Sequence, residues 1–152
     1  MPPLEATLAP AQPQETLELD ELWSFVGHRR RGVVWLWLAL CRRTRQIVAY
    51  APGPRDDATA RLLWERIPLA YRHGPLCTDH LESYHNLLPA PQHRAYYPKR
   101  GLTNHIERFN NTPRQRLGRF VRKTLSFSKS ILMHEIVIRL SLHQYNLACS
   151  PK

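Results

Sequence analysis

The stretch "TLELDELWSFVGHRRRGVVWLWLALCRRTRQIVAYAPG", residues 16–53, decides the fold. It contains three runs rich in apolar and aromatic residues, at 16–27, 33–41 and 44–53, and each run predicts a β-strand. The run at 33–41 is apolar throughout, which is typical of a strand that is buried on both faces. The polar segment 27–32 is bounded by glycines and predicts a hairpin loop. Three strands that follow one another in this way form an antiparallel meander.

After residue 53 the apolar pattern changes from the strand period to the helical period. Residues 56–68 predict a helix, with Asp56 or Asp57 as the N-cap and Pro68 as the stop. The next residues predict a short strand at 74–80, a short helix at 81–89 and a last strand at 92–98. A helix is expected from Thr103, with a kink or an end at Pro113. A long final helix is expected to begin near Ser126 or Ser128.

This order of elements, β-β-β-α-β-α-β-α with further helix at the C-terminus, predicts an α/β protein. Three antiparallel strands followed by alternating helix and strand are typical of a mixed sheet with helices packed on it. The 152 residues fit one domain with a substantial core. We expect residues 1–16 to be a flexible, Pro-rich lead-in and residues 17–152 to form the domain.

Composition narrows the class of partner. A hydrophobic content of 43% excludes a disordered basic tail, and a formal charge of +10 favours a polyanion, either nucleic acid or an anionic membrane surface. Structural basic proteins share such a charge, so it does not choose between functions. No apolar run reaches the roughly 20 residues that span a bilayer, and the N-terminus lacks the features of a signal peptide. We therefore expect a cytoplasmic protein with no membrane partner.

Cysteine usage argues against a metal knuckle or a disulfide framework in this chain. Cys41, Cys77 and Cys149 are odd in number and widely spaced, and no C-x-x-C pair occurs. Buried free thiols are the expected state of these residues.

Three carboxylates stand out among only twelve acidic residues. Asp20 lies within the first predicted strand, Asp79 at the end of the strand "LCTD", and Glu107 one turn into the helix that begins near Thr103. If the first and fourth strands are neighbours and this helix crosses them, the three carboxylates converge. Converging carboxylates favour a cation such as Mg²⁺, and two such ions can assist an in-line displacement at phosphorus. The alternatives are a turn or cap role for Asp79, and a capping-box or ion-pair role for Glu107.

Glu107 is also the one acidic residue between Ser83 and His134, an interval that is otherwise strongly basic. We interpret six bases after it as contacts to the DNA backbone, with salt-sensitive and mostly sequence-independent binding. A solvated helix face is the alternative for each of them. These six are Arg108, Arg114, Arg116, Arg119, Arg122 and Lys123.

Four stretches, "ELDELWSFVG", "CTDHLESY", "TNHIERFNNTPRQRL" and "VRKTLSFSKS", together closely resemble insertion-sequence transposases of the IS-one type. The resemblance runs from about Glu18 to Asn146. It implies a ribonuclease-H-like fold and an acid triad of Asp20, Asp79 and Glu107 that binds Mg²⁺ or Mn²⁺. It also implies hydrolysis at the ends of the element, followed by attack of the released 3′ hydroxyls on target DNA.

The resemblance carries further expectations about partners. They are the DNA of the element's ends and of the target, a homo-oligomer on DNA, association with a prokaryotic nucleoid, and an upstream-frame product with zinc-binding cysteines and a helix-turn-helix. Pro113 departs from the family pattern, in which an apolar residue such as Leu is usual. Two alternatives stay open: a metal nuclease of the same fold, and an inactive transposase relic that inhibits by binding DNA or a partner.

Overall fold

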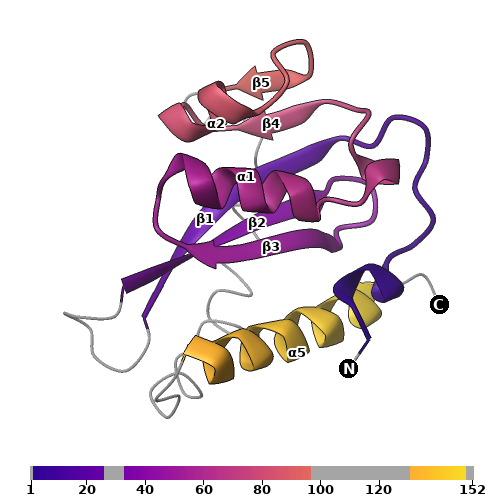
Figure 1. Ribbon diagram of the computed structural model, residues 1–152. Helices are drawn as coiled ribbons and strands as arrows, with labels where there is room; N and C mark the ends of the chain where they lie inside the picture. The colour runs from indigo at the N-terminus through magenta and orange to yellow at the C-terminus, as the bar shows by residue number, and fades with distance from the viewer. Residues whose placement is uncertain (1, 26–32, 97–130, 150–152) are drawn as a thin grey trace.

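The computed structural model describes residues 2–25, 33–96 and 131–149. Within them the chain forms a five-stranded mixed sheet with helices packed on it (Figure 1). The strands are β1 (Leu17–Phe25), β2 (Val33–Cys41), β3 (Ile47–Gly53), β4 (Leu76–Thr78) and β5 (His93–Ala95), in the spatial order β3-β2-β1-β4-β5. The helices are α1 (Asp57–Arg66), α2 (Glu82–Leu87) and α5 (Ile131–Cys149), with short 3₁₀ turns η1 (Leu4–Thr7) and η2 (Leu69–Tyr71).

The first three strands form the predicted antiparallel meander. β1 pairs with β2 and β2 with β3, both antiparallel, whereas β4 pairs in parallel with β1, and β5 in parallel with β4. Helix α1 carries the chain from β3 back to β4, because parallel strands require a crossover rather than a tight hairpin. The predicted α/β mixed sheet is therefore confirmed. The hairpin loop predicted at 27–32 lies outside the described residues.

Helix α1 begins and ends where the local sequence predicts. Asp56 is the N-cap, and its Oδ1 accepts hydrogen bonds from the amide and the hydroxyl of Thr59, both at 2.9 Å. The helix ends at Arg66, and Ile67 is the extended C-cap before Pro68.

The last predicted helices are only partly described. The long C-terminal helix is confirmed over Ile131–Cys149. Its expected start near Ser126 or Ser128, and the expected helix from Thr103 with a break at Pro113, lie outside the described residues. None of the helices in the described part combines the length and the apolarity needed to cross a bilayer.

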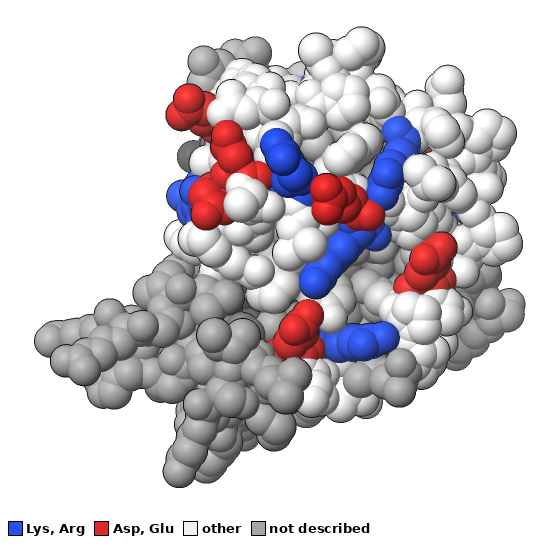
Figure 2. Space-filling view, in the orientation of Figure 1, with Lys and Arg blue, Asp and Glu red and all other residues white. Residues whose placement is uncertain are grey.

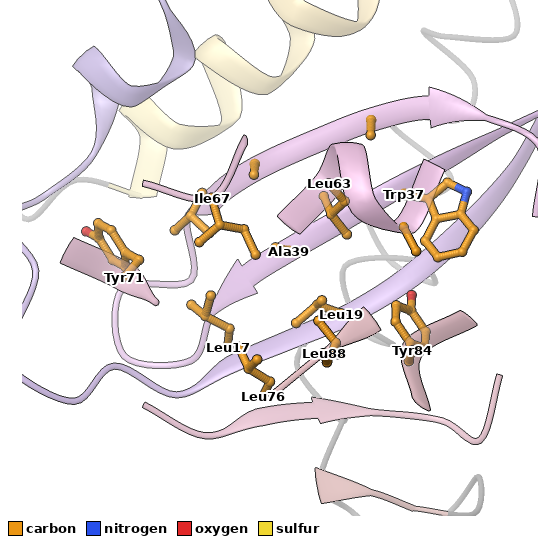
Figure 3. Close-up of a cluster of buried hydrophobic side chains, with 14 of the residues drawn as sticks. Leu17, Leu19, Trp37, Ala39, Leu63, Ile67, Tyr71, Leu76, Tyr84 and Leu88 are labelled. Atoms are coloured by element: carbon orange, nitrogen blue, oxygen red, sulfur yellow. The ribbon is translucent and has the colours of Figure 1, made fainter. Parts of the chain in front are cut away.

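The sheet separates two hydrophobic clusters because alternate residues of a strand point to opposite faces. On one face, residues such as Leu17, Leu19 and Trp37 pack with Leu63 of α1 and Tyr84 of α2 (Figure 3). On the other face, residues that include Leu36, Leu38 and Leu40 pack with residues of α5 that include Ile138 and Leu142. β2 is thus buried on both faces from Leu36 to Cys41, as its apolar sequence predicts.

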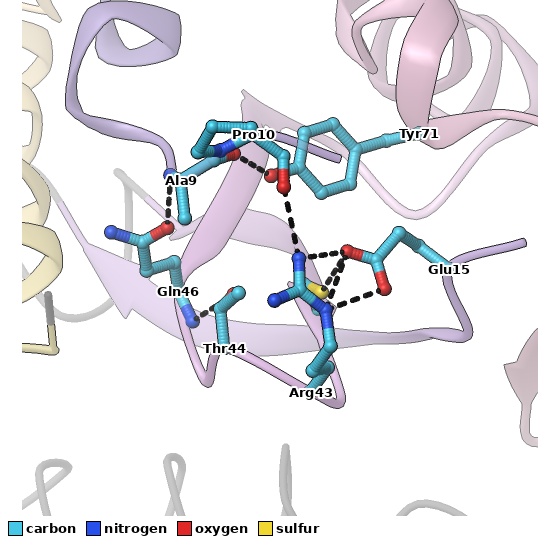
Figure 4. Close-up of polar contacts among 8 residues, drawn as sticks. Ala9, Pro10, Glu15, Arg43, Thr44, Gln46 and Tyr71 are labelled. Carbon is cyan, nitrogen blue, oxygen red and sulfur yellow. Dashed lines mark hydrogen bonds and ion pairs between the residues drawn. The ribbon is translucent and has the colours of Figure 1, made fainter. Parts of the chain in front are cut away.

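The N-terminal segment, which we predicted to be a flexible lead-in, contacts the sheet and η2 in the structure. Leu4 is buried, and the amide of Ala9 donates to Gln46 Oε1 at 2.8 Å while the carbonyl of Ala9 accepts from the Tyr71 hydroxyl (Figure 4). The segment also crosses Gly74 closely, since a Cβ there would lie 2.2 Å from the carbonyl oxygen of Glu15. Backbone polar groups near a core must be hydrogen-bonded, and these contacts satisfy them. The domain boundary at residue 16 stays a prediction.

Candidate active site

Two of the three predicted site residues, Asp20 and Asp79, lie at the same level of neighbouring strands. In the parallel pairing of β1 with β4, Leu17 is opposite Leu76 and Glu18 is opposite Cys77. The same register, continued by two residues, sets Asp20 level with Asp79, which directly follows the last residue of β4. The carboxyl ends of parallel strands commonly present the residues of a site.

The carboxylates at this level form a compact cluster of three. One carboxylate oxygen from each of Asp20, Glu21 and Asp79 lies within 4.8 Å of the others. Asp20 and Asp79 are partly exposed, whereas Glu21 is buried. The third predicted acid, Glu107, lies outside the described residues, so the structure brings together two members of the predicted triad and adds Glu21.

Backbone amides orient the two aspartates. Asp20 Oδ1 accepts a hydrogen bond from the amide of Glu21 at 2.9 Å, and Asp79 Oδ1 accepts one from the amide of Leu81 at 3.0 Å. The second bond is the local turn role that a strand-end aspartate often has. Since it uses Oδ1, this turn role and a site role for Asp79 are compatible. The hydroxyl of Thr78 donates to the carbonyl of Asp79 at 2.6 Å and stabilises the same turn.

Glu21 is the functional candidate that our sequence analysis missed. Its Oε2 accepts a hydrogen bond from the Tyr84 hydroxyl at 2.7 Å, and its Oε1 pairs with Arg55 Nη2 at 2.9 Å. Burial raises the pKa of the Glu21 carboxyl above its usual value, and the negative charge of Asp79 acts in the same direction. Neighbouring residues of a strand point to opposite faces, so adjacency to Asp20 did not suggest a shared site. Two features of the sequence could have suggested a role for Glu21: it is an acid directly beside Asp20, and its partner Tyr84 lies five residues after Asp79.

Three histidines lie close to one another next to the turn that contains Asp79. His80 Nδ1 and His85 Nε2 are 3.3 Å apart, the rings of His85 and His93 have centroids 5.0 Å apart, and His93 Nε2 is 2.6 Å from Thr78 Oγ1. Burial lowers the pKa of His93, and the neighbouring histidines lower it further.

The chemistry of the donor set fits a hard divalent cation. The three clustered donors are carboxylate oxygens, which suit Mg²⁺ and Mn²⁺ better than they suit zinc. Three like charges at this separation also repel one another unless a cation or a proton intervenes. The six bases predicted to contact DNA, Arg108, Arg114, Arg116, Arg119, Arg122 and Lys123, all lie outside the described residues.

The family model described as IS1 transposase matches residues 15–146. The chain belongs to the IS1 transposase family. It is 41% identical over 121 residues to the insertion element iso-IS1n protein InsB of Shigella dysenteriae, covering 80% of this chain and 88% of that protein. The insertion element IS1 protein InsB of Shigella flexneri is 39% identical over the same coverage. The predicted resemblance is therefore confirmed.

The fold of this IS1-family chain is also found in a retroviral protein. The catalytic core domain of HTLV-2 integrase, solved in complex with magnesium in a trimeric form, superposes with a TM-score of 0.54. The superposition covers 89% of this chain and 83% of the integrase chain at 11% sequence identity. At that identity the likeness concerns the fold alone, and it confirms the predicted ribonuclease-H-like class for the IS1 transposase.

Proposed function

We propose that this chain is the catalytic domain of a DDE transposase that cleaves DNA and joins the released strand to target DNA in a metal-dependent reaction. One observation carries the proposal: in a chain of the IS1 transposase family, carboxylate oxygens of Asp20 and Asp79 lie within 4.8 Å of each other where β1 passes the end of β4. That separation suits two ligands of one divalent ion.

In this proposal Asp20, Asp79 and Glu107 hold Mg²⁺ or Mn²⁺. When bound, such ions activate a water or 3′ hydroxyl nucleophile and neutralise charge on the scissile phosphate. The contribution of the chain is preorganisation. The amides of Glu21 and Leu81 fix the two aspartates before any substrate arrives, so that little reorganisation is needed during the reaction. The fold shared with an integrase core that was solved with magnesium supports this assignment.

The proposed partner is DNA, both the ends of an insertion sequence and the target. We assign backbone contacts to the six bases that follow Glu107, because Lys and Arg neutralise phosphates without reading sequence. A homo-oligomer on DNA, an upstream-frame product that recognises the ends, and action at a prokaryotic nucleoid complete the proposal.

Strand nicking and strand transfer with Mg²⁺ or Mn²⁺ test this function. We expect Asp20→Asn and Asp79→Asn to lower both rates by at least about 100-fold, as loss of one charge-stabilising group typically does. Glu82→Gln is the matched control, since Glu82 is an exposed carboxylate three residues after Asp79 and lies outside the cluster. This variant should retain wild-type rates.

The other outcomes separate the alternatives. Equal rates in wild type and Asp79→Asn would exclude the proposed metal site. Nicking without strand transfer would favour a metal nuclease of the same fold. Salt-sensitive DNA binding with no reaction in the wild type would favour an inactive relic that acts as an inhibitor.

A further inference from the structure

The backbone pairing between β1 and β4 stops before it reaches the candidate metal site. In the described residues the ladder joins Leu17 to Leu76 and Glu18 to Cys77, and β4 ends one residue later at Thr78. β1 continues to Phe25 without this partner. The ladder therefore ends two residues before Asp20 and Asp79, and backbone pairing alone does not fix the separation of their side chains.

A buried side-chain hydrogen bond spans this gap. The Tyr84 hydroxyl donates to Glu21 Oε2 at 2.7 Å. Glu21 follows Asp20 on β1, and Tyr84 belongs to α2, the helix whose preceding turn begins with Asp79. The bond thus joins the segment that carries one aspartate to the segment that carries the other.

Both ends of this bond are held in place by packing. Glu21 is opposite Trp37 in the β1–β2 register, and the ring of Tyr84 meets the ring of Trp37 edge-on, with centroids 5.4 Å apart (Figure 3). On its other oxygen Glu21 pairs with Arg55, and the Arg55 guanidinium lies 4.7 Å from the centroid of the Trp35 ring. A carboxylate anchored from two sides in this way has little freedom to change rotamer.

We propose that Glu21 is a positioning residue, which through Tyr84 holds Asp20 and Asp79 at the separation that binds a divalent cation. This inference rests on the proposed function. Although Glu21 belongs to the carboxylate cluster, Tyr84 and Arg55 engage its two oxygens, so in this proposal it acts through the hydrogen bond and not as a ligand. Loss of an outer partner of this kind typically weakens metal affinity by roughly 10- to 100-fold.

Binding of Mn²⁺ to the full chain, followed by electron paramagnetic resonance, tests the proposal without any reaction. Tyr84→Phe removes the hydroxyl and changes no charge, and we expect it to raise the Kd for Mn²⁺ about tenfold. Tyr71→Phe is the matched control. Tyr71 is also buried in the same core, and its hydroxyl donates to the carbonyl of Ala9, on the N-terminal segment. Tyr71→Phe should cost stability and leave the Kd unchanged.

A double-variant cycle with Glu21→Gln shows whether the two residues act as one unit. We expect Glu21→Gln to weaken Mn²⁺ binding, and the added Tyr84→Phe change to weaken it little further. Wild-type affinity in Tyr84→Phe would overturn the proposal, even if Glu21→Gln abolished binding, because Glu21 would then act as a ligand. Equal weakening in Tyr71→Phe would overturn it as a general effect of stability.

Asp79→Asn in the same titration separates this inference from the proposed function. If Asp79→Asn binds Mn²⁺ like wild type, the metal site itself fails. If Asp79→Asn loses binding while Tyr84→Phe keeps it, only the positioning role of Glu21 fails.

Discussion

Glu15 shows how a buried charge ties the N-terminal segment to the sheet. Its side chain is 3% exposed, and Arg43 reaches it from the turn after β2 with Nε–Oε1 at 3.0 Å and Nη2–Oε2 at 2.7 Å (Figure 4). The same guanidinium donates to the carbonyl of Pro10 at 3.0 Å. A carboxylate at this depth requires such partners, because burial without them is costly.

The Glu15 contact predicts a pH-dependent contribution to stability. Hydrogen bonding to Arg43 lowers the pKa of Glu15 in the folded protein below its ordinary value of 4.5. The folded state therefore binds the proton more weakly than the unfolded chain. The stabilisation is fully present above pH 4.5 and is lost as the pH falls through the lower folded pKa.

Urea unfolding followed by Trp fluorescence measures this contribution. At pH 7 we expect Glu15→Gln to lower the free energy of unfolding by about 1.5–3 kcal/mol, the range for hydrogen bonds to charged groups. The difference from wild type should shrink as the pH falls below 4.5. Glu5→Gln, at an exposed position of the same segment, should change stability little at either pH. If wild type and Glu15→Gln differed in free energy of unfolding by the same amount at pH 7 and below pH 4.5, the ionised Glu15 carboxylate would not be the source of the stabilisation.

At the scale of elements, α5 is held to the sheet by a buried amide as well as by apolar contacts. Asn146 is fully buried, its Oδ1 accepts from the amide of Ile47 at 2.7 Å, and its Nδ2 donates to the carbonyl of Ile47 at 2.8 Å. Nδ2 also donates to the hydroxyl of Thr7 at 2.9 Å. The N-terminal segment, the start of β3 and the end of α5 therefore meet at one side chain, beside each other in Figure 1.

Loss of this amide should loosen α5 selectively. Asn146→Ala leaves the buried N–H and C=O of Ile47 without their partner, and we expect the free energy of unfolding to fall by about 2–4 kcal/mol. Gln144→Ala, at an exposed position of the same helix, should cost less than about 0.5 kcal/mol. Amide hydrogen exchange should show faster exchange in α5 for Asn146→Ala only. Unchanged exchange in α5 would mean that apolar packing alone holds the helix.

At the scale of the whole molecule, the positive charge is concentrated in two segments of the sequence. Residues 26–32 contain three consecutive arginines, and residues 97–130 contain nine bases with Glu107 as their one acid. By contrast, acidic and basic side chains are intermixed on the face of the described part shown in Figure 2. The net charge of +10 therefore belongs to these segments rather than to the described sheet and helices.

DNA binding should depend on salt through these bases. We expect log Kd to rise linearly with log salt concentration, and Arg116→Ala with Arg119→Ala together to lower that slope by roughly one unit per base removed. Arg61→Ala, which removes an exposed arginine of α1, should leave the slope unchanged. Fluorescence anisotropy with a labelled duplex gives the slope. An unaltered slope in the double variant would place Arg116 and Arg119 away from the phosphates.

Within the described residues, local pattern was sufficient to predict the strands and the α-helices. The strands from 17 to 53 and the N-cap at Asp56 follow from neighbouring residues, since alternation and capping are short-range effects. The contacts of the N-terminal segment were not predicted, because Pro-rich composition does not reveal a partner such as Arg43, which lies 28 residues from Glu15.

For the candidate site, the sequence by itself determined that Asp20 and Asp79 stand at a strand and at a strand end. Only the tertiary structure decided that they share one level of the sheet, because the register of β1 with β4 depends on pairing across 59 residues. The tertiary structure also determined the contacts of Glu21, because its partners Tyr84 and Arg55 lie 63 and 34 residues away in the sequence. Such long-range contacts follow from how the strands and helices pack, and no local pattern encodes them.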